Sequence, residues 1–463
     1  MKKPTSPPAS LPNNRRGHLN NICVIGLGRI GLPFALLAAK KGFSVCGVDT
    51  NAKIVNALKN GRIPFREPGL SQLIISNRSR LKPTTSLPEA IKQSSVVLCC
   101  VGTRRYATNR PNLKLLYKIF RDLARTEIRG RLIVLRTTVP IGTTRALAGY
   151  LEELTGLRAD VDFYLAFAPE RTVEGRAVEE LETLPVIVGA MGEESLRRAT
   201  GFYDRMGAEV AKVVNPEAAE LVKLIDNTFR ITRFAFANDI AFVSERIGVN
   251  AHDVIDAANF RYPRNSIPYP SCGVSGYCLS KDPYYLEEAF RPIRAERHFC
   301  SIWMNARKSY DFRSRQLVGQ ILRFLEKMGR TAKDARVLVC GVAFKSNVDD
   351  TRGSHGLFIA SEFARKGAKV SVWDPCITGE LKGYLLHKDP YDAFREKDVA
   401  IFTIAHDQFV QVANGIERFT RLMRTPLIYD GAGLLRARSP STSTFYLMGT
   451  GFPSYRFAGV SRT

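Results

Sequence analysis

The sequence predicts an α/β protein in which two Rossmann-like, doubly wound domains are joined by a central helical region with one long helix. Three observations lead to this prediction. A glycine-rich turn stands between an apolar strand and a helix near the N-terminus, and the stretch from Pro216 to Gly248 has no glycine or proline inside it. A second alternation of apolar strands and helices begins near residue 335. Strands that alternate with helices are typical of parallel sheets covered on both faces.

The first strand, turn and helix carry a dinucleotide-binding signature. Apolar residues 22–25 lead into Gly26-x-Gly28-x-x-Gly31, a helix ends at Gly42, and a second strand ends at Asp49. Such glycines let the backbone approach a pyrophosphate at the helix N-terminus, and the acidic residue binds a ribose 2′-hydroxyl. Chance glycines also occur in turns, but with these flanking elements the motif predicts NAD rather than NADP. The residues expected to contact NAD are Gly26, Gly28, Arg29, Ile30, Gly31, Asp49, Thr103 and Thr138.

Three further apolar stretches extend the first sheet, at residues 94–103, 131–139 and 163–170. Helical stretches lie between them, as in a doubly wound sheet. Ligands in this fold bind at the carboxyl ends of the strands. The polar residues expected at these ends are Thr103, Thr138 and Glu170.

The stretch from Pro216 predicts a long helix that Gly248 terminates. Glu220, Lys223 and Asn227 follow one another at helical spacing, so they share one side of the helix. A charged side of a helix usually faces solvent. The apolar neighbours of Lys223 leave a functional role for these residues equally open.

The second α/β segment resembles another Rossmann-like unit but lacks the three-glycine motif. Its first strand ends in a single glycine, Gly341, and its second strand ends at Asp374. The expected strands and helix, in order, lie within residues 335–345, 356–367, 368–375, 398–406 and 426–433.

Composition limits the class of protein. Lys and Arg outnumber Asp and Glu by 68 to 44, which gives a net charge of +24. This charge suits a small anionic substrate as well as nucleic acid, but no basic stripe interleaved with aromatic residues occurs, so we expect no nucleic-acid partner. The cysteines form no C-x-x-C pair and the histidines are scattered, which predicts reduced thiols and no metal site. The reduced thiols indicate a cytoplasmic protein. No apolar run approaches the ~18–20 residues of a membrane helix, so we expect no membrane insertion.

Composition and pattern also suggest domain boundaries. Residues 1–20 are basic and rich in Pro, Ser and Asn, as in a disordered tail. An NAD-binding domain is expected over 21–212, a central helical domain over 213–320 and a C-terminal Rossmann-like domain over 321–463.

The loop GVSGYCLSKDP, residues 273–283, is unusual because it crowds glycines and a serine around Cys278. Asp282 follows four residues later. Glycine permits close approach of the backbone, and proline fixes a turn. The loop is either a tight turn with an incidental thiol or a structure that presents a nucleophile to a substrate.

Taken in order, the motifs resemble those of one family. The glycine-rich turn with its distal aspartate is followed by TTVPIGTT, APERTVEG, the long helix, the cysteine loop and GVAFKSNVDDTR. This order resembles the nucleotide-sugar 6-dehydrogenases, which include the UDP-glucose and UDP-N-acetylmannosamine dehydrogenases, from about residue 21 to about residue 435. The resemblance implies an NAD domain, a helical middle that usually forms a homodimer, and a C-terminal domain that binds uridine diphosphate.

The resemblance also implies a four-electron reaction, in which a sugar C6 alcohol becomes a carboxylate. A thiolate adds to the intermediate aldehyde, the hemithioacetal gives up a second hydride, and water hydrolyses the resulting thioester. A fixed cation stabilises the oxyanions. By resemblance the nucleophile is Cys278, the acid/base group Asp282, the oxyanion-stabilising pair Lys223 and Asn227, the water-activating carboxylate Glu170 and the water-positioning residue Thr138.

The substrate side of the resemblance is a UDP-sugar. Arg264, Lys345 and Arg352 are the candidate diphosphate and uridine contacts, because Arg and Lys suit phosphates, although each could be a surface cation. Glu170, Arg171 and Lys223 complete the expected substrate contacts. Arg171 after APE and the segment KDPYYL resemble the N-acetylhexosamine branch, so we expect UDP-N-acetylmannosamine or UDP-N-acetylglucosamine, with UDP-glucose as the alternative.

The cysteine loop departs from the family pattern, and so do two other places. A serine in place of a glycine with positive φ would strain the loop, so pocket shape is expected to differ. A two-electron hydroxyacid dehydrogenase would need neither the cysteine nor the C-terminal domain, whereas a non-catalytic binding protein would explain the altered loop. The departures are Ser271, Cys272, Ser275, Tyr277 and Ser280 in the loop, Gly102 and Arg104 after the fourth strand, and Gly353 in DDTRGS.

Overall fold

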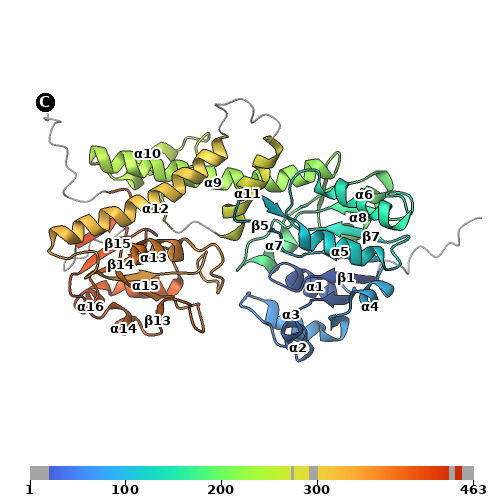
Figure 1. Cartoon of the computed structure of the whole chain (residues 1–463), viewed down its shortest axis with the longest axis horizontal. Coiled ribbons are helices and arrows are strands. Elements are labelled where there is room, and N and C mark those ends of the chain that lie inside the picture. Colours follow the sequence, from blue (N-terminus) through green and yellow to red (C-terminus); the bar gives the residue numbers. More distant parts are fainter. Residues whose placement is uncertain (1–19, 273–275, 291–300, 437–443, 451–463) are drawn as a thin grey trace, which may run out of the picture. The chain divides into compact units, whose positions relative to one another are not determined.

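The computed structural model of the chain describes residues 20–272, 276–290, 301–436 and 444–450. It divides into two compact units. The first comprises residues 1–104 and 112–221, and the second residues 105–111 and 222–463. The expected tail lies outside the described residues apart from Asn20, and so does Ser275. Figure 1 labels many of the helices and strands of each unit.

The first unit is built on an eight-stranded sheet with the order β10-β9-β8-β7-β4-β1-β2-β3. All its neighbouring strands are parallel except β8 and β9. The strands are β1 (Asn21–Ile25), β2 (Ser44–Val48), β3 (Leu81–Thr84), β4 (Val96–Cys99), β7 (Leu132–Leu135), β8 (Tyr164–Phe167), β9 (Val186–Ala190) and β10 (Val210–Lys212). The helices are α1 (Gly31–Lys40), α2 (Ala52–Lys59), α3 (Leu70–Asn77), α4 (Leu87–Lys92), α5 (Lys114–Ala124), α6 (Thr143–Thr155), α7 (Ala177–Thr183) and α8 (Glu193–Met206).

The second unit contains long helices and a second sheet. The sheet has the order β13-β12-β11-β14-β15-β16 and is parallel throughout. Its strands are β11 (Arg336–Cys340), β12 (Lys369–Trp373), β13 (Leu385–His387), β14 (Val399–Phe402), β15 (Leu427–Asp430) and β16 (Thr444–Leu447). The helices are α9 (Pro216–Ile247), which begins in the first unit, α10 (Ala251–Asn259), α11 (Tyr277–Glu287), α12 (Ile302–Lys327), α13 (His355–Arg365), α14 (Pro390–Phe394), α15 (Asp407–Asn414) and α16 (Ile416–Thr420).

The predicted fold class is confirmed, and the long helix ends one residue before Gly248 as expected. The sequence pattern missed several short elements, namely β3, β9, β10, β13, β16 and the two-stranded sheet of β5 (Arg104–Arg105) and β6 (Pro111–Asn112). These strands are short and lie at or near sheet edges, where an apolar run is not required. Within the described residues, no helix is long and apolar enough to cross a membrane.

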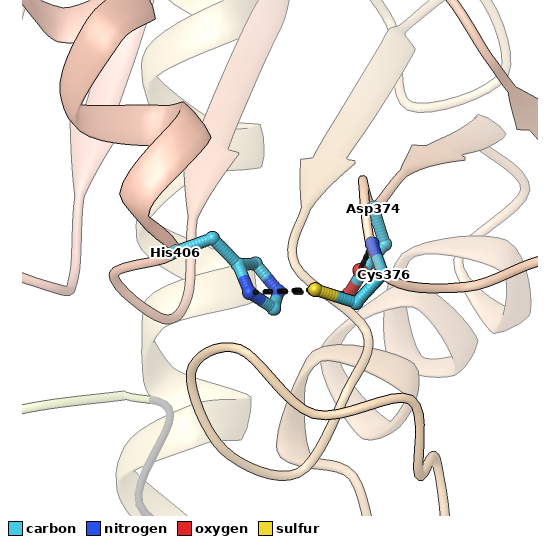
Figure 2. Close-up of side chains that lie close together, drawn as sticks. All are labelled: Asp374, Cys376 and His406. Carbon is cyan, nitrogen blue, oxygen red and sulfur yellow. Dashed lines mark hydrogen bonds and ion pairs between the residues drawn. The ribbon is translucent and has the colours of Figure 1, made fainter. Parts of the chain in front are cut away.

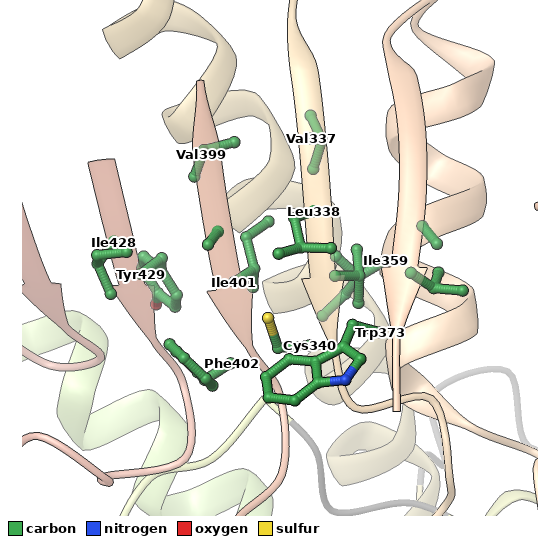
Figure 3. Packing of buried hydrophobic residues seen from close by; sticks show 14 of the residues in the cluster. Val337, Leu338, Cys340, Ile359, Trp373, Val399, Ile401, Phe402, Ile428 and Tyr429 are labelled. Carbon is green, nitrogen blue, oxygen red and sulfur yellow. The ribbon is translucent and has the colours of Figure 1, made fainter. Parts of the chain in front are cut away.

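The second sheet is held by one continuous apolar core. Figure 3 shows members of this core from four strands and a helix, namely Leu338 of β11, Trp373 at the end of β12, Ile401 of β14, Ile428 of β15 and Ile359 of α13. Leu338, Ile401, Ile428 and Ile359 are fully buried. Strands covered on both faces need such unbroken apolar runs, which is why the sequence pattern detected β11, β12 and β14.

Two glycines in each unit perform the same packing function. An added Cβ at Gly31 would lie 1.8 Å from the carbonyl oxygen of Gly26, and one at Gly356 would lie 2.1 Å from that of Gly341. Gly26 and Gly341 both have positive φ, +91° and +98°. The second unit therefore retains the outer glycines of the first, but the turn between them is replaced by a longer loop over residues 342–355.

Candidate active site

The glycine turn of the first unit has the geometry of a dinucleotide site. The Oδ2 of Asp49 accepts a hydrogen bond from the backbone N–H of Leu27 at 2.9 Å, and its Oδ1 accepts one from Asn51 at 2.8 Å. A carboxylate has about four acceptor positions, so lone pairs remain for ribose hydroxyls. An added Cβ at Gly28 would meet no protein atom within 4 Å. Because packing does not require Gly28, its small size fits the approach of a ligand such as the NAD pyrophosphate.

The other predicted cofactor residues line this turn or follow the strands. Arg29 forms an ion pair with Glu174 at 3.4 Å and lies over the ring of Phe65, whereas Ile30 is partly exposed. The hydroxyl of Thr103 donates to the carbonyl oxygen of Thr138 at 2.7 Å. The structure therefore brings together two predicted residues that follow neighbouring strands, β4 and β7.

Glu170 lies in the interior of the first unit. Its Oε2 accepts a hydrogen bond from the guanidinium of Arg136 at 2.5 Å, and its Oε1 accepts one from the backbone N–H of Thr172 at 2.8 Å. Burial alone would raise the pKa of Glu170, but Arg136 and Thr172 hold it below its ordinary value. Sequence analysis missed Arg136, although a cation directly after the apolar run of β7 was a visible signal.

Cys278 differs from the other described cysteines, because it is exposed whereas the others are buried or half-buried. It occupies the first turn of α11, where backbone N–H groups favour a negatively charged sulfur. Burial raises the pKa of Cys99, Cys100 and Cys272 to about 12, so these thiols stay protonated and inert. Among the described residues, the sequence-predicted nucleophile is therefore the thiol best placed to react.

A polar cluster is buried close to Cys278 in the second unit. Nδ2 of Asn227 donates to Oδ2 of Asp282 at 2.6 Å, and Nζ of Lys281 donates to Oδ1 at 2.6 Å. Although burial opposes its charge, Asp282 and then Tyr285 and Cys278 raise the pKa of Lys281. Lys223, one turn before Asn227 on α9, is also buried. Sequence analysis missed Lys281, although it stands in the quoted loop beside Asp282.

The departures in the cysteine loop have structural partners. Ser271 exchanges two hydrogen bonds with the side chain of Asn238, at 2.9 and 3.1 Å. Cys272 is buried against Gly431, and its N–H donates to the Gly431 carbonyl at 3.1 Å. The N–H of Ser280 donates to the carbonyl of Gly276 at 3.1 Å, a helical bond that proline could not make.

Gly353, the departure in DDTRGS, touches the cysteine loop directly. Its carbonyl accepts a hydrogen bond from the N–H of Gly276 at 3.2 Å. An added Cβ at Gly353 would lie 2.9 Å from the carbonyl carbon of Gly276, so a larger residue would displace the start of α11. Gly276 in turn has φ +116° and would place a Cβ 2.7 Å from the ring of Phe344.

The candidate substrate cations differ in their exposure to solvent. Arg264 is exposed and donates to the hydroxyl of Tyr262 at 2.8 Å, and Lys345 is half-buried. Arg352 is exposed, and its Nε donates to Oδ1 and Oδ2 of Asp350 at 3.0 and 2.8 Å. Arg171 is half-buried and lies 3.5 Å from the carbonyl of Pro185, a long contact.

A second polar cluster, shown in Figure 2, joins Asp374, Cys376 and His406 near the ends of β12 and β14. These are residue types that bind zinc, and sequence analysis did not detect the grouping because thirty positions separate His406 from Cys376. Oδ2 of Asp374 already accepts from the N–H groups of Val342 and Ala343, at 2.7 and 2.8 Å, and lies 3.2 Å from Nε2 of His406.

His406 is committed to the same loop. Its Nδ1 accepts from the N–H of Asn347 at 2.9 Å, so the ring is neutral with its proton on Nε2, which lies 3.2 Å from Oδ2 of Asp374. Since both ring nitrogens have partners, the cluster anchors the loop that carries Lys345. Asp374 is also the counterpart of Asp49, which binds the equivalent turn in the first unit.

Glu220, predicted to share a side with Lys223, is wholly buried in the first unit. Its carboxylate accepts hydrogen bonds from the N–H of Gly142 at 2.6 Å and from the N–H and hydroxyl of Thr144 at 2.7 and 2.6 Å. Burial nonetheless raises the pKa of Glu220 to about 7. Glu220 therefore caps α6 and fixes the first turns of α9 to it.

Three family profiles match the chain in succession. They describe the NAD-binding, central and UDP-binding domains of the UDP-glucose/GDP-mannose dehydrogenase family, and they match residues 20–207, 217–309 and 338–437. A UDP-N-acetyl-D-mannosamine dehydrogenase of Pyrococcus horikoshii is 32% identical over 90% of this chain and 96% of its own length. One of Campylobacter jejuni is 31% identical over 85% and 97%.

Solved structures of UDP-sugar dehydrogenases have folds similar to that of this chain. The structure of the Pyrococcus horikoshii UDP-N-acetylmannosamine dehydrogenase superposes with a TM-score of 0.85 at 32% identity, over 93% of this chain and 99% of that one. A UDP-glucose dehydrogenase from Pyrobaculum islandicum superposes with a TM-score of 0.79 at 26% identity, over 96% and 100%.

Proposed function

Because the chain belongs to the UDP-glucose/GDP-mannose dehydrogenase family, we propose that it is an NAD-dependent UDP-sugar 6-dehydrogenase acting on UDP-N-acetylmannosamine. The observation that carries the proposal most strongly is the exposed Cys278 beside a buried Asn227–Asp282–Lys281 cluster. A two-electron dehydrogenase needs no such thiol. Burying the charges of Asp282 and Lys281 is costly, and a thiol without a catalytic role would not require them nearby.

The first half of the reaction removes hydrogen from the C6 alcohol. Asp282 takes the hydroxyl proton, and the cations Lys223 and Lys281 stabilise the developing oxyanion. Gly28 and Asp49 would hold NAD at the glycine turn, and the bound cofactor would supply the hydride acceptor for each of the two oxidations.

The second half depends on Cys278. Its sulfur adds to the C6 aldehyde to form a hemithioacetal, whose oxidation leaves a thioester. Water then attacks the thioester carbonyl, Glu170 takes the water proton, and the carbon–sulfur bond breaks to release the uronic acid. Thr138 positions this water in the proposal.

The family resemblance suggests how the rest of the substrate is bound. Residues 21–212, 213–320 and 321–463 are proposed as the NAD, central and UDP domains. Arg264, Lys345 and Arg352 are proposed diphosphate or uridine contacts, and the Asp374–His406 cluster supports Lys345 through its loop. Arg171 is a proposed contact of the sugar. UDP-N-acetylglucosamine and UDP-glucose are the competing substrates, the latter favoured by the likeness to the Pyrobaculum islandicum enzyme.

We also propose a homodimer formed through α9, in a cytoplasmic protein of polysaccharide precursor synthesis. Six apolar side chains of this helix are exposed and fall on one stripe at intervals of four or seven residues, and exposed apolar stripes mark interfaces. They are Leu221, Ile225, Phe229, Phe236, Val243 and Ile247. Light scattering would test this proposal, since a mass near one chain, 51.6 kDa, would contradict it.

The experiment for the proposed function counts the reduced cofactor. Purified protein and NAD are mixed with one of the three UDP-sugars at a time. The absorbance of NADH is followed until the limiting sugar is consumed. We expect two NADH per sugar and a clear preference for UDP-N-acetylmannosamine. One NADH per sugar would indicate the two-electron alternative, and none despite binding would indicate a non-catalytic protein.

The matched control pairs Cys278→Ser with Cys272→Ser. Cys278→Ser should abolish net acid formation while binding of NAD and UDP-sugar continues, because the thioester cannot form. Cys272→Ser removes a buried thiol instead and should retain two NADH per sugar.

A further inference from the structure

Arg136 is a buried cation to which the proposed reaction assigns no role. It follows β7 directly and is 3% exposed. Nη2 donates to Oε2 of Glu170 at 2.5 Å, and Nη1 donates to the hydroxyl of Tyr203, on α8, at 2.8 Å. Its guanidinium lies over the ring of Phe34, on α1, with 4.4 Å to the ring centroid. Three elements of the first unit therefore hold this side chain in one position.

The environment of this ion pair contains other titratable groups that stay neutral. Burial raises the pKa of Cys100, which follows β4, to about 12, and burial also raises the pKa of Tyr203. Both are uncharged near neutral pH. Arg136 is thus the charged group in hydrogen-bond contact with Glu170. Without a cation, a carboxyl buried to this degree becomes protonated, because desolvation disfavours the charged form.

Orientation is fixed as well as charge. Nε of Arg136 is buried and has no acceptor in the described part of the chain, so the bonds to Glu170 and Tyr203 determine how the fork lies. The backbone N–H of Thr172 fixes the other oxygen of Glu170. A carboxylate held at both oxygens presents its remaining lone pairs in constant directions.

We propose that Arg136 is a positioning residue for thioester hydrolysis, which keeps Glu170 as an oriented carboxylate able to take a proton from the attacking water. This inference depends on the proposed function. In the step concerned, the water oxygen bonds to the thioester carbon, one water proton passes to Glu170, and the carbon–sulfur bond breaks so that Cys278 leaves as a thiolate. No oxidation or reduction occurs, and Arg136 itself neither gains nor loses a proton.

The test compares Arg136→Met, which removes the charge, with Arg136→Lys, which keeps the charge but loses the fork. Each variant is mixed with NAD and UDP-N-acetylmannosamine, and the steady-state rate is measured across pH while intact-protein mass spectrometry detects any covalent adduct on Cys278. We expect Arg136→Met to lower the rate at least tenfold, to accumulate the thioester adduct, and to move the acidic limb of the pH–rate profile upward by more than about one pH unit. Arg136→Lys keeps the charge, so its acidic limb should lie between those of the wild type and Arg136→Met.

A merely structural role would give a different result. If Arg136→Met, with wild-type NAD binding and thermal stability, kept the wild-type acidic limb and formed no adduct, the inference would be wrong while the proposed function stood. If Arg136→Met does not fold, Tyr203→Phe replaces it, with a smaller shift expected in the same direction and an unchanged profile contradicting the inference. If the wild-type protein forms no NADH with any UDP-sugar, the proposed function fails and the inference falls with it.

Discussion

At the scale of single residues, the most informative positions are the departures in the cysteine loop. The family pattern suggested strain, but the structure supplies Ser271, Cys272 and Ser280 with hydrogen-bond partners. Cys272 is an example, because the space for its sulfur exists only through the absence of a side chain at Gly431. An added Cβ at Gly431 would lie 2.0 Å from Sγ of Cys272. The loop and the end of β15 are therefore matched to each other.

This matching predicts a coupled pair of substitutions. Gly431→Ala should lower the free energy of unfolding by about 1–3 kcal/mol, because overpacking displaces the buried sulfur. In combination with Cys272→Ala the cost of Gly431→Ala should fall by at least half, since the sulfur is gone. Urea unfolding of the two single variants and the double variant measures the coupling. Strictly additive costs would show that the two side chains do not compete for this space.

Some site residues were accessible from the sequence and others were not. Cys278, Asp282 and Asn227 were identified because they stand in motifs of fixed order, and the structure brings Asn227 and Asp282 into contact. Arg136 and the Asp374–His406 pair were missed. Their partners lie on other strands or helices far along the chain, so no local spacing reveals them. A buried ion pair is a property of packing, which a motif does not encode.

At the scale of elements, caps and anchors explain how helices are held where the site needs them. Glu220 of α9 caps α6, Glu67 accepts from the N–H groups of Gly175 and Ala177 at the start of α7, and Ser354 caps α13. A helix N-terminus has unpaired N–H groups, and in these three helices a carboxylate or hydroxyl side chain accepts from one or two of them. These contacts explain why short helices such as α7 form despite weak apolar patterns.

The Glu220 cap can be tested against a matched neighbour. Glu220→Gln should lower the free energy of unfolding by about 1–3 kcal/mol, because an amide cannot accept all three hydrogen bonds and leaves buried donors unpaired. Glu217, three residues earlier on α9, pairs with Arg145 at an exposed position. Glu217→Gln should therefore change stability by less than about 0.5 kcal/mol. Urea unfolding with hydrogen exchange at residues 142–147 measures both, and equal effects of the two variants would contradict a capping role.

At the scale of the whole molecule, the chain uses one architecture twice. Both units have a glycine that meets the carbonyl of an earlier glycine, and an aspartate after the second strand that binds the turn. In the first unit, where the turn is short, the sequence motif located these glycines and Asp49 but assigned them to NAD rather than to the turn itself. In the second unit the longer loop hides the correspondence, since Gly356 follows Gly341 by fifteen positions. That loop provides the room for Lys345 and for the contact between Gly353 and Gly276.

The second unit also contains a buried histidine that links a long helix to this sheet. His355, the first residue of α13, contacts the hydroxyl of Ser314 on α12, and its ring lies edge-on to Tyr310 with 4.6 Å between centroids. Burial, with the nearby Arg307, lowers the pKa of His355 to about 3. The unfolded state has a His pKa of about 6.5, so it binds more protons than the folded state between these values. Stability is therefore greatest above pH 6.5 and is lost as pH falls toward 3.

This linkage predicts an acid sensitivity that one substitution removes. Between pH 7 and pH 5 the neutral His355 should account for a loss of about 2 kcal/mol in the free energy of unfolding, at ~1.4 kcal/mol for each pH unit below the unfolded pKa. His355→Gln keeps a partner for Ser314 but has no titrating group, so its stability should be flatter with pH by that amount. Urea unfolding of the second unit at several pH values measures the slope. As a control, His387→Gln at a half-buried position should remove a smaller part of the slope. A wild-type slope in His355→Gln would mean that a group other than His355 causes the loss of stability in acid.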